Sequence, residues 1–253
     1  MISPDRFLSL IDKLITSISN NKRSPSAKSG YEYPALIEQK GDADDLVIFF
    51  AHHNASREFI EKTIKQFQGS NVIAFVGGDP LDPNPHSTII YYHESIKYML
   101  DKIEKHINIF KPKSIVIVGV SLGSIFALPI AEKISQQINK LILVVSGASL
   151  AKSLWRGIQT QDLKRAYAQQ GFTDNTLDEL WKTLSPESHL DLSGVRSISI
   201  FLSKVDKVVP YDEGKRLAEL IKEKFPDKTS VNENKYKGHA LTILWSSKNL
   251  YNK

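Results

Sequence analysis

Apolar residues recur along this chain in two patterns, short continuous runs and longer stretches with helical spacing. From residue 31 onward the two kinds of segment alternate. Runs such as DLVIFF and SIVIVGV have strand length and are apolar on both faces, as in a parallel sheet covered by helices on each side. The pattern therefore predicts an α/β fold with a mainly parallel central sheet and helices on both faces. Strands are expected at 31–39, 45–51, 71–76, 114–120, 140–145, 197–202 and 231–236, and helices at 57–67, 88–110, 124–138, 212–225 and from Leu241.

The segment 149–188 departs from this alternation. It holds two or three helical pieces where one crossover helix is sufficient, and it includes Trp155 and Trp181. We interpret it as a small helical cap inserted into the main domain. The two tryptophans fit a substrate pocket for an apolar group, and they fit the core of the cap equally well.

The first 30 residues differ from the rest of the chain. Residues 4–19 place apolar side chains at helical spacing opposite several charged ones, and residues 20–30 are polar and rich in turn formers. We expect an amphipathic helix that packs on the domain, with a membrane-surface anchor as the alternative. The expected organisation is a helix and linker at 1–30, followed by one domain at 31–253 that carries the cap.

Composition removes several classes of protein. Of the 253 residues, 41% are hydrophobic and 24% charged, which is the balance of a globular protein, and no apolar run has the length of a transmembrane helix. The net charge of +5 comes from lysines interleaved with acids, so we expect no nucleic-acid partner. The absence of cysteine excludes disulfides and a cysteine nucleophile. Charges interrupt the only apolar segment near the N-terminus, so we expect no signal peptide and a cytoplasmic protein.

The most informative motif is Gly119-Val120-Ser121-Leu122-Gly123, which directly follows an apolar strand and opens a predicted helix. A serine on such a sharp turn presents its hydroxyl above the sheet, and side chains two residues on either side of it would collide. Glycine at 119 and 123 removes those side chains. The same turn aims the backbone N–H of Leu122 at the reacting carbonyl, as an oxyanion donor. The motif therefore predicts that Ser121 is a nucleophile.

A serine nucleophile needs a base and an acid that orients it. His239 follows the last expected strand, at the edge where catalytic groups of such sheets gather, whereas His93 and His106 lie in a predicted helix and read as surface residues. Asp206 follows the strand at 197–202 at that same edge. Asp178, in the cap, and Asp191, before its strand, are weaker substitutes. The predicted set is Ser121, His239 and Asp206.

In this order along the chain, Ser121, Asp206 and His239 resemble the catalytic residues of the α/β-hydrolase family, in particular serine esterases and lipases with a small helical cap. The resemblance covers most of the chain from residue 31. In that family a His-Gly loop after an early strand supplies a second oxyanion amide. Here the loop reads Ala51-His52-His53-Asn54, without the glycine, so the resemblance assigns the second amide to Asn54 or His53.

We expect neither a metal nor an organic cofactor. Consecutive histidines in a turn do not readily bind one ion together, and no nearby carboxylate or histidine completes a ligand set around His52 and His53. The predicted function is a serine hydrolase, carboxylesterase-like, that cleaves an ester, thioester or amide of a small-molecule acyl substrate. Two alternatives stay open: a non-catalytic ligand or protein binder on the same fold, and an acyltransferase.

Overall fold

The structure is a computed structural model and describes residues 33–52, 55–77, 81–134 and 138–250. The described residues belong to one compact unit that begins at Tyr33. The amphipathic helix and linker expected at 1–30 lie outside the described residues, so that part of the domain organisation stays a prediction.

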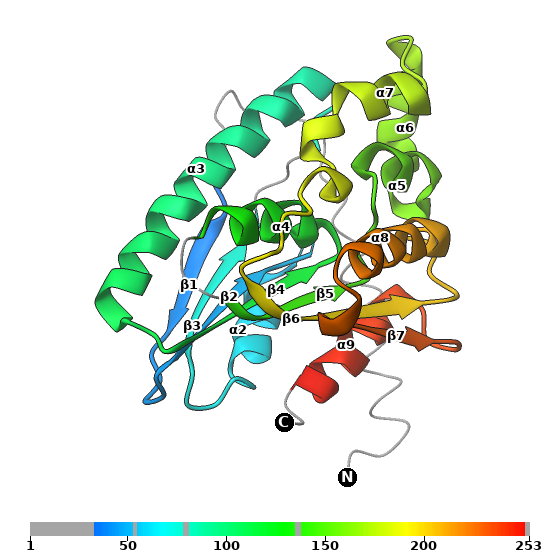
Figure 1. Cartoon of the computed structure of the whole chain (residues 1–253). Coiled ribbons are helices and arrows are strands. Elements are labelled where there is room, and N and C mark those ends of the chain that lie inside the picture. Colours follow the sequence, from blue (N-terminus) through cyan, green and yellow to red (C-terminus); the bar gives the residue numbers. More distant parts are fainter. Residues whose placement is uncertain (1–32, 53–54, 78–80, 135–137, 251–253) are drawn as a thin grey trace. The chain divides into compact units, whose positions relative to one another are not determined.

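The centre of this unit is a seven-stranded sheet with strand order β1-β3-β2-β4-β5-β6-β7 (Figure 1). Every neighbouring pair is parallel except β1 and β3, which are antiparallel. The prediction of an α/β fold with a mainly parallel sheet is thereby confirmed. The strands are β1 (Ala35–Gln39), β2 (Asp45–Phe50), β3 (Asn71–Val76), β4 (Ser114–Val120), β5 (Ile138–Val144), β6 (Val195–Ser203) and β7 (Thr229–Asn234).

Helices connect the strands and cover both faces of the sheet. No helix within the described ranges combines the length and the apolarity needed to cross a membrane. The α-helices are α2 (Arg57–Ile64), α3 (Pro85–Phe110), α4 (Ser124–Lys133), α5 (Leu150–Arg156), α6 (Gln161–Gln169), α7 (Asp174–Leu180), α8 (Tyr211–Lys224) and α9 (His239–Leu250).

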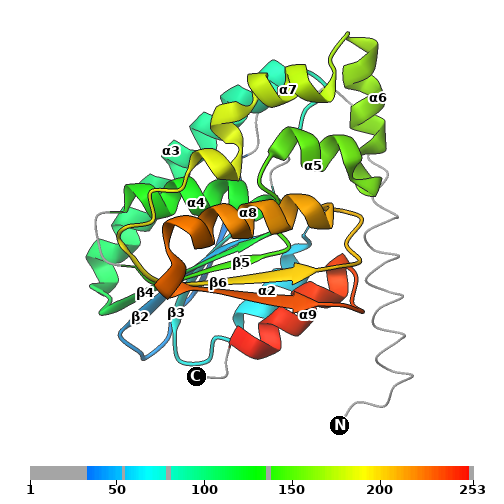
Figure 2. The ribbon, with the colours of Figure 1, turned by 45° about the vertical axis from the view of Figure 1, so that its right-hand side comes forward.

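Two hydrophobic layers hold the sheet between its helices. Alternate residues of β2 separate cleanly: Leu46 and Ile48 join the layer under α3, α4 and α8, while Val47 joins the layer under α2 and α9. Figure 2 shows these two sets of helices on opposite sides of the strands. Because side chains alternate along a strand, a strand buried on both faces must be apolar throughout, which explains the continuous runs in the sequence.

Several helix ends differ from the sequence prediction. Helix α3 begins at Pro85 rather than Thr88, since the Asn84 side chain caps it by accepting the N–H of His86. Helix α4 ends at Lys133, shorter than the expected 124–138, because Ile134 has extended backbone angles. Helix α9 begins at His239 rather than Leu241.

The segment 149–188 contains α5, α6 and α7 together with short 3-10 turns. Figure 1 shows these helices over the side of the sheet that α3 and α8 cover, near the first turn of α3. Three hydrogen bonds fasten the segment there: Tyr167 donates to the carbonyl of Asp82, Gln170 to Pro83 and Trp181 to Pro85. The segment thus holds three α-helices that are bonded to the start of α3, and its role as an inserted cap stays a prediction.

Candidate active site

The turn at Ser121 joins the end of β4 to the start of α4. Ser121 opens a 3-10 turn, Ser121–Gly123, and has a φ of 52°. A non-glycine residue with positive φ is uncommon and strained, and such strain concentrates at functional sites. Ser121 is a buried residue, 7% exposed.

Both glycines of the motif are required by close approaches. A Cβ on Gly123 would lie 2.3 Å from the carbonyl oxygen of Phe50 and 2.7 Å from that of Ala51. A Cβ on Gly119 would lie 2.7 Å from the Cβ of Ala127 in α4. The first contact also brings the end of β2 against the serine turn.

The sequence predicts oxyanion donors in two segments, the serine turn and the loop after β2. Leu122 lies in the 3-10 turn and packs partly buried against the larger core layer, which leaves its role to the backbone amide. His53 and Asn54 lie outside the described residues, so their assignment stays a prediction. His52, the last described residue before them, packs edge-on against the ring of Phe59 in α2, with ring centroids 5.5 Å apart.

Asp206 and His239 form a hydrogen-bonded pair. Nδ1 of His239 lies 2.8 Å from Oδ2 of Asp206, while Oδ1 of Asp206 accepts the backbone N–H groups of Val208 at 2.8 Å and Val209 at 3.1 Å. The carboxylate side chain is only 3% exposed. Because both of its oxygens are engaged, the aspartate is held in one orientation towards the imidazole.

The loop before His239 is tied to the end of β6. The carbonyl of Lys237 accepts the hydroxyls of Ser203 and Thr242, and the side chain of Asn234 accepts the N–H groups of Tyr236 and Lys237. Since Ser203 ends the strand that leads to Asp206, these contacts help to fix the position of the His239 imidazole relative to the Asp206 carboxylate.

The three residues occupy one edge of the sheet. Ser121, Asp206 and His239 follow the carboxyl ends of β4, β6 and β7, which lie on the same side of a parallel sheet. The hydrogen bonds of the described residues join Asp206 to His239 and include none between the Ser121 hydroxyl and His239. Hydrogen bonds of catalytic groups are often long or misaligned without substrate.

The weaker acid candidates are engaged elsewhere. Asp178 accepts a hydrogen bond from the Ser149 hydroxyl and forms an ion pair with Lys152. The hydrogen bond between Asp178 and Lys152 raises the pKa of the lysine. Asp191 accepts the hydroxyl of Ser193. Of the histidines expected on the helix surface, His106 is instead buried: its Nε2 lies 3.0 Å from Oε1 of Glu38 in β1, because that face of α3 packs on the sheet.

The two cap tryptophans have different surroundings. Trp181 is fully buried, donates its indole N–H to the carbonyl of Pro85 at 2.9 Å and meets the ring of Tyr167 edge-on. This environment favours the core role for Trp181. Trp155 is partly buried in α5, with the Lys164 ammonium 5.4 Å from its ring centroid.

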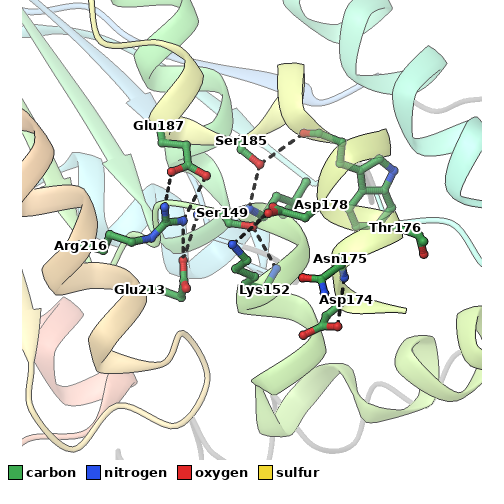
Figure 3. Close-up of polar contacts among 12 residues, drawn as sticks. Ser149, Lys152, Asp174, Asn175, Thr176, Asp178, Ser185, Glu187, Glu213 and Arg216 are labelled. Atoms are coloured by element: carbon green, nitrogen blue, oxygen red, sulfur yellow. Dashed lines mark hydrogen bonds and ion pairs between the residues drawn. The ribbon is translucent and has the colours of Figure 1, made fainter. Parts of the chain in front are cut away.

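A polar network joins the cap to α8, and sequence analysis did not find it. Figure 3 shows Glu213 and Arg216 of α8 facing Glu187 and the start of α5. Oε2 of Glu213 accepts the backbone N–H of Ser149 and a hydrogen bond from Arg216, which also binds both oxygens of Glu187. Glu213 is 4% exposed. One signal was available: Glu213 shares a helical face with Leu217 and Ile221, four and eight residues on, which places a carboxylate on a buried stripe.

We compared the sequence and the structure with those of known proteins. No family model and no curated protein matches the sequence. Among solved structures, an acylaminoacyl peptidase of Pyrococcus horikoshii matches 87% of this chain with a TM-score of 0.56 and 14% identity. The chain spans 40% of the length of that peptidase.

Two similar structures have nearly the same extent as this chain. A monoacylglycerol lipase of Paleococcus ferrophilus matches 86% of this chain and 99% of its own, with a TM-score of 0.54 and 14% identity. An esterase of Exiguobacterium antarcticum matches 85% of this chain and 92% of its own, with a TM-score of 0.53 and 13% identity. From this likeness and the strand–serine–helix turn, the described part of the chain has the α/β-hydrolase fold.

Proposed function

We propose that this protein is a serine hydrolase that cleaves a carboxylic ester or a related acyl bond, with Ser121 as nucleophile, His239 as base and Asp206 as the residue that orients the base. The observation that carries the proposal is the pairing of two features at one sheet edge. A strained serine turn follows β4, and a buried Asp206–His239 pair follows β6 and β7. A satisfied loop histidine does not need a buried carboxylate with both oxygens engaged.

The proposed reaction has two halves. The Ser121 hydroxyl attacks the acyl carbonyl while Nε2 of His239 takes its proton, and the carbonyl oxygen becomes an oxyanion held by the Leu122 amide and by the amide of Asn54 or His53. The tetrahedral intermediate collapses, the alcohol leaves with the proton from His239, and Ser121 keeps the acyl group. Water then attacks the acyl-enzyme with His239 again as base, which releases the acid and restores the serine.

The Asp206–His239 contact favours the tautomer that this reaction needs. A carboxylate beside Nδ1 favours a proton on that nitrogen, which leaves Nε2 free to accept the serine proton. The same carboxylate stabilises the imidazolium formed in the tetrahedral intermediate. The mechanism requires no metal or organic cofactor.

Among acyl bonds we favour carboxylic esters. The printed names of two similar structures, a monoacylglycerol lipase and an esterase, support this choice. Trp155, partly buried at the start of the cap, is the side chain we assign to the wall of an acyl pocket. Trp181 contributes by holding the cap against α3.

A covalent probe tests the nucleophile directly. We expect the protein to be labelled by a fluorophosphonate and to hydrolyse p-nitrophenyl esters, and we expect Ser121→Ala and His239→Ala to lose both. Ser146→Ala is the matched control, because Ser146 follows the end of the neighbouring strand β5 and is also buried. Labelling that persists in Ser121→Ala, or disappears in Ser146→Ala, contradicts the assignment. A native protein that binds small acyl compounds without labelling supports the non-catalytic binder.

A further inference from the structure

Large apolar side chains are exposed beside the candidate site. Val205, one residue before Asp206, is 46% exposed, and Tyr236, three residues before His239, is 88% exposed. Ile158, in the turn after α5, is 59% exposed. Few large apolar side chains of the described residues are exposed to this degree; the others are Tyr33, Ile90 and Ile109.

These side chains belong to loops that lie side by side. The N–H of Lys204 donates to the carbonyl of Asn234 at 2.8 Å, which joins the end of β6 to the end of β7. The N–H of Ile158 donates to the carbonyl of Lys207 at 2.9 Å, which adds the turn after α5 to the same edge. Backbone contacts therefore bring three exposed apolar positions together around the Asp206–His239 pair.

The same loops are strongly basic. They carry Lys204, Lys207, Lys235 and Lys237, and the carboxylate within them, Asp206, is buried against His239. We call the six positions Lys204, Val205, Lys207, Lys235, Tyr236 and Lys237 the basic rim.

Partners among the described residues neutralise only part of this charge. Lys204 forms an ion pair with Glu233 at 2.7 Å, and the Lys237 ammonium lies 5.9 Å from the Trp245 ring centroid. Lys207 and Lys235 are exposed and make no ion pair with a described residue. Lys207 and Lys235, unpaired within the described part of the chain, thus flank the exposed Val205 and Tyr236.

This combination of groups matches one kind of surface. Lysines near a membrane surface gain about 1 kcal/mol each from anionic headgroups, and a tyrosine is suited to the boundary between headgroups and acyl chains. A nucleic acid satisfies the lysines and stacks on the tyrosine, but it offers nothing to Val205 and Ile158. An acyl layer accepts both aliphatic side chains.

We propose that the basic rim docks on an anionic lipid surface and so brings the candidate site to ester-bearing lipids in that surface. The docking itself does not depend on catalysis, whereas the delivery of lipid esters rests on the proposed hydrolase function. Lys207 and Lys235 supply the attraction, and Tyr236 and Val205 insert at the interface.

Vesicle binding tests the docking with the full chain carrying Ser121→Ala, so that hydrolysis cannot alter the lipid. We expect this protein to sediment with vesicles of phosphatidylcholine mixed with phosphatidylserine, weakly or not at all with phosphatidylcholine alone, and less at high salt. Lys207→Glu combined with Lys235→Glu is expected to weaken binding at least about tenfold. Tyr236→Ser is expected to weaken it several-fold at unchanged net charge.

The matched control is Lys65→Glu combined with Lys97→Glu, which makes the same change of charge. Lys65 is the exposed C-cap residue of α2, and Lys97 is exposed within α3. We expect this control to bind as the parent does. No binding to anionic vesicles, equal weakening in the control, or binding that the rim substitutions leave unchanged overturns the proposal. So does binding to a DNA duplex through these lysines without any vesicle binding. If the Ser121→Ala chain docks but the native chain is not labelled by a fluorophosphonate, the hydrolase function is refuted and the docking stands.

Discussion

Oε2 of Glu213 lies 3.1 Å from the backbone nitrogen of Ser149, so a buried carboxylate of α8 caps the first helix of the cap. The backbone reinforces this contact, because the N–H of Ala148 donates to the carbonyl of Glu213 at 3.1 Å. Gly147, directly before Ala148, is tightly packed as well: a Cβ on it would lie 2.3 Å from the Ser153 hydroxyl and 3.1 Å from a methyl group of Val209. Since Asp206 accepts the N–H of Val209, the start of the cap and the proposed catalytic acid belong to one packed unit.

Removing the Glu213 carboxylate should loosen the cap. We expect Glu213→Ala to lower the free energy of unfolding by about 3 kcal/mol, because Arg216 and the Ser149 amide lose a buried partner. Glu213→Gln keeps an acceptor for the amide and should cost less. Urea unfolding measures both. Glu219→Ala, in the same helix but exposed and paired with Lys215, should change stability by less than about 1 kcal/mol. Equal losses at 213 and 219 would contradict a buried clamp.

A side chain at Gly123 should disrupt the serine turn. We expect Gly123→Ala to lower stability by about 3 kcal/mol and to abolish ester hydrolysis, because its Cβ meets backbone atoms of Phe50 and Ala51 that have little room to move. Gly194→Ala is the control, since a Cβ there meets nothing within 4 Å. Thermal unfolding and p-nitrophenyl ester turnover give the two readouts. Full activity in Gly123→Ala is incompatible with this geometry.

Replacing the acid should affect turnover far more than folding. In Asp206→Asn the amide N–H₂ faces Nδ1 of His239, which favours the tautomer with its proton on Nε2 and removes the base. We expect kcat to fall roughly 10³-fold to 10⁴-fold with little change in KM. Asp191→Asn, beyond the other end of β6, should retain parental kinetics. The hypothesis fails if Asp206→Asn turns over at the parental rate or if the two variants are equally impaired.

The indole N–H of Trp181 should matter apart from the size of the ring. Trp181→Phe keeps most of the buried aromatic surface but leaves the Pro85 carbonyl without its donor, so we expect a loss of about 2 kcal/mol in unfolding free energy. Trp155→Phe, at a partly buried position, should cost less than about 1 kcal/mol. Chemical denaturation compares the two. A larger effect at 155 than at 181 would reverse the roles assigned to these tryptophans.

Short-range patterns were enough to predict the layers of this fold. A strand apolar on both faces needs helices on both faces, and β2, β4 and β5 carry that requirement in their own residues. The glycine at 119 likewise answers a local need, because a side chain there would meet Ala127 in the helix that follows, whereas the glycine at 123 makes room for the end of β2, which is distant along the chain. The ends of helices were predicted less well, since a single cap such as Asn84 outweighs three residues of periodicity.

The tertiary structure alone decided the contacts between residues that are distant along the chain. Asp206 and His239 are 33 residues apart, and the order of β6 and β7 in the sheet brings them to 2.8 Å. In the sequence Glu213 is one of several charges on an amphipathic helix, and only the fold shows that it binds the start of the cap. In the sequence Trp181 fits a pocket and a core equally well, and only the fold shows its indole hydrogen bond to Pro85. Hydrophobic periodicity reports whether a side chain is buried. Which polar partner a buried side chain meets depends on how the elements are packed, and only the assembled fold contains that information.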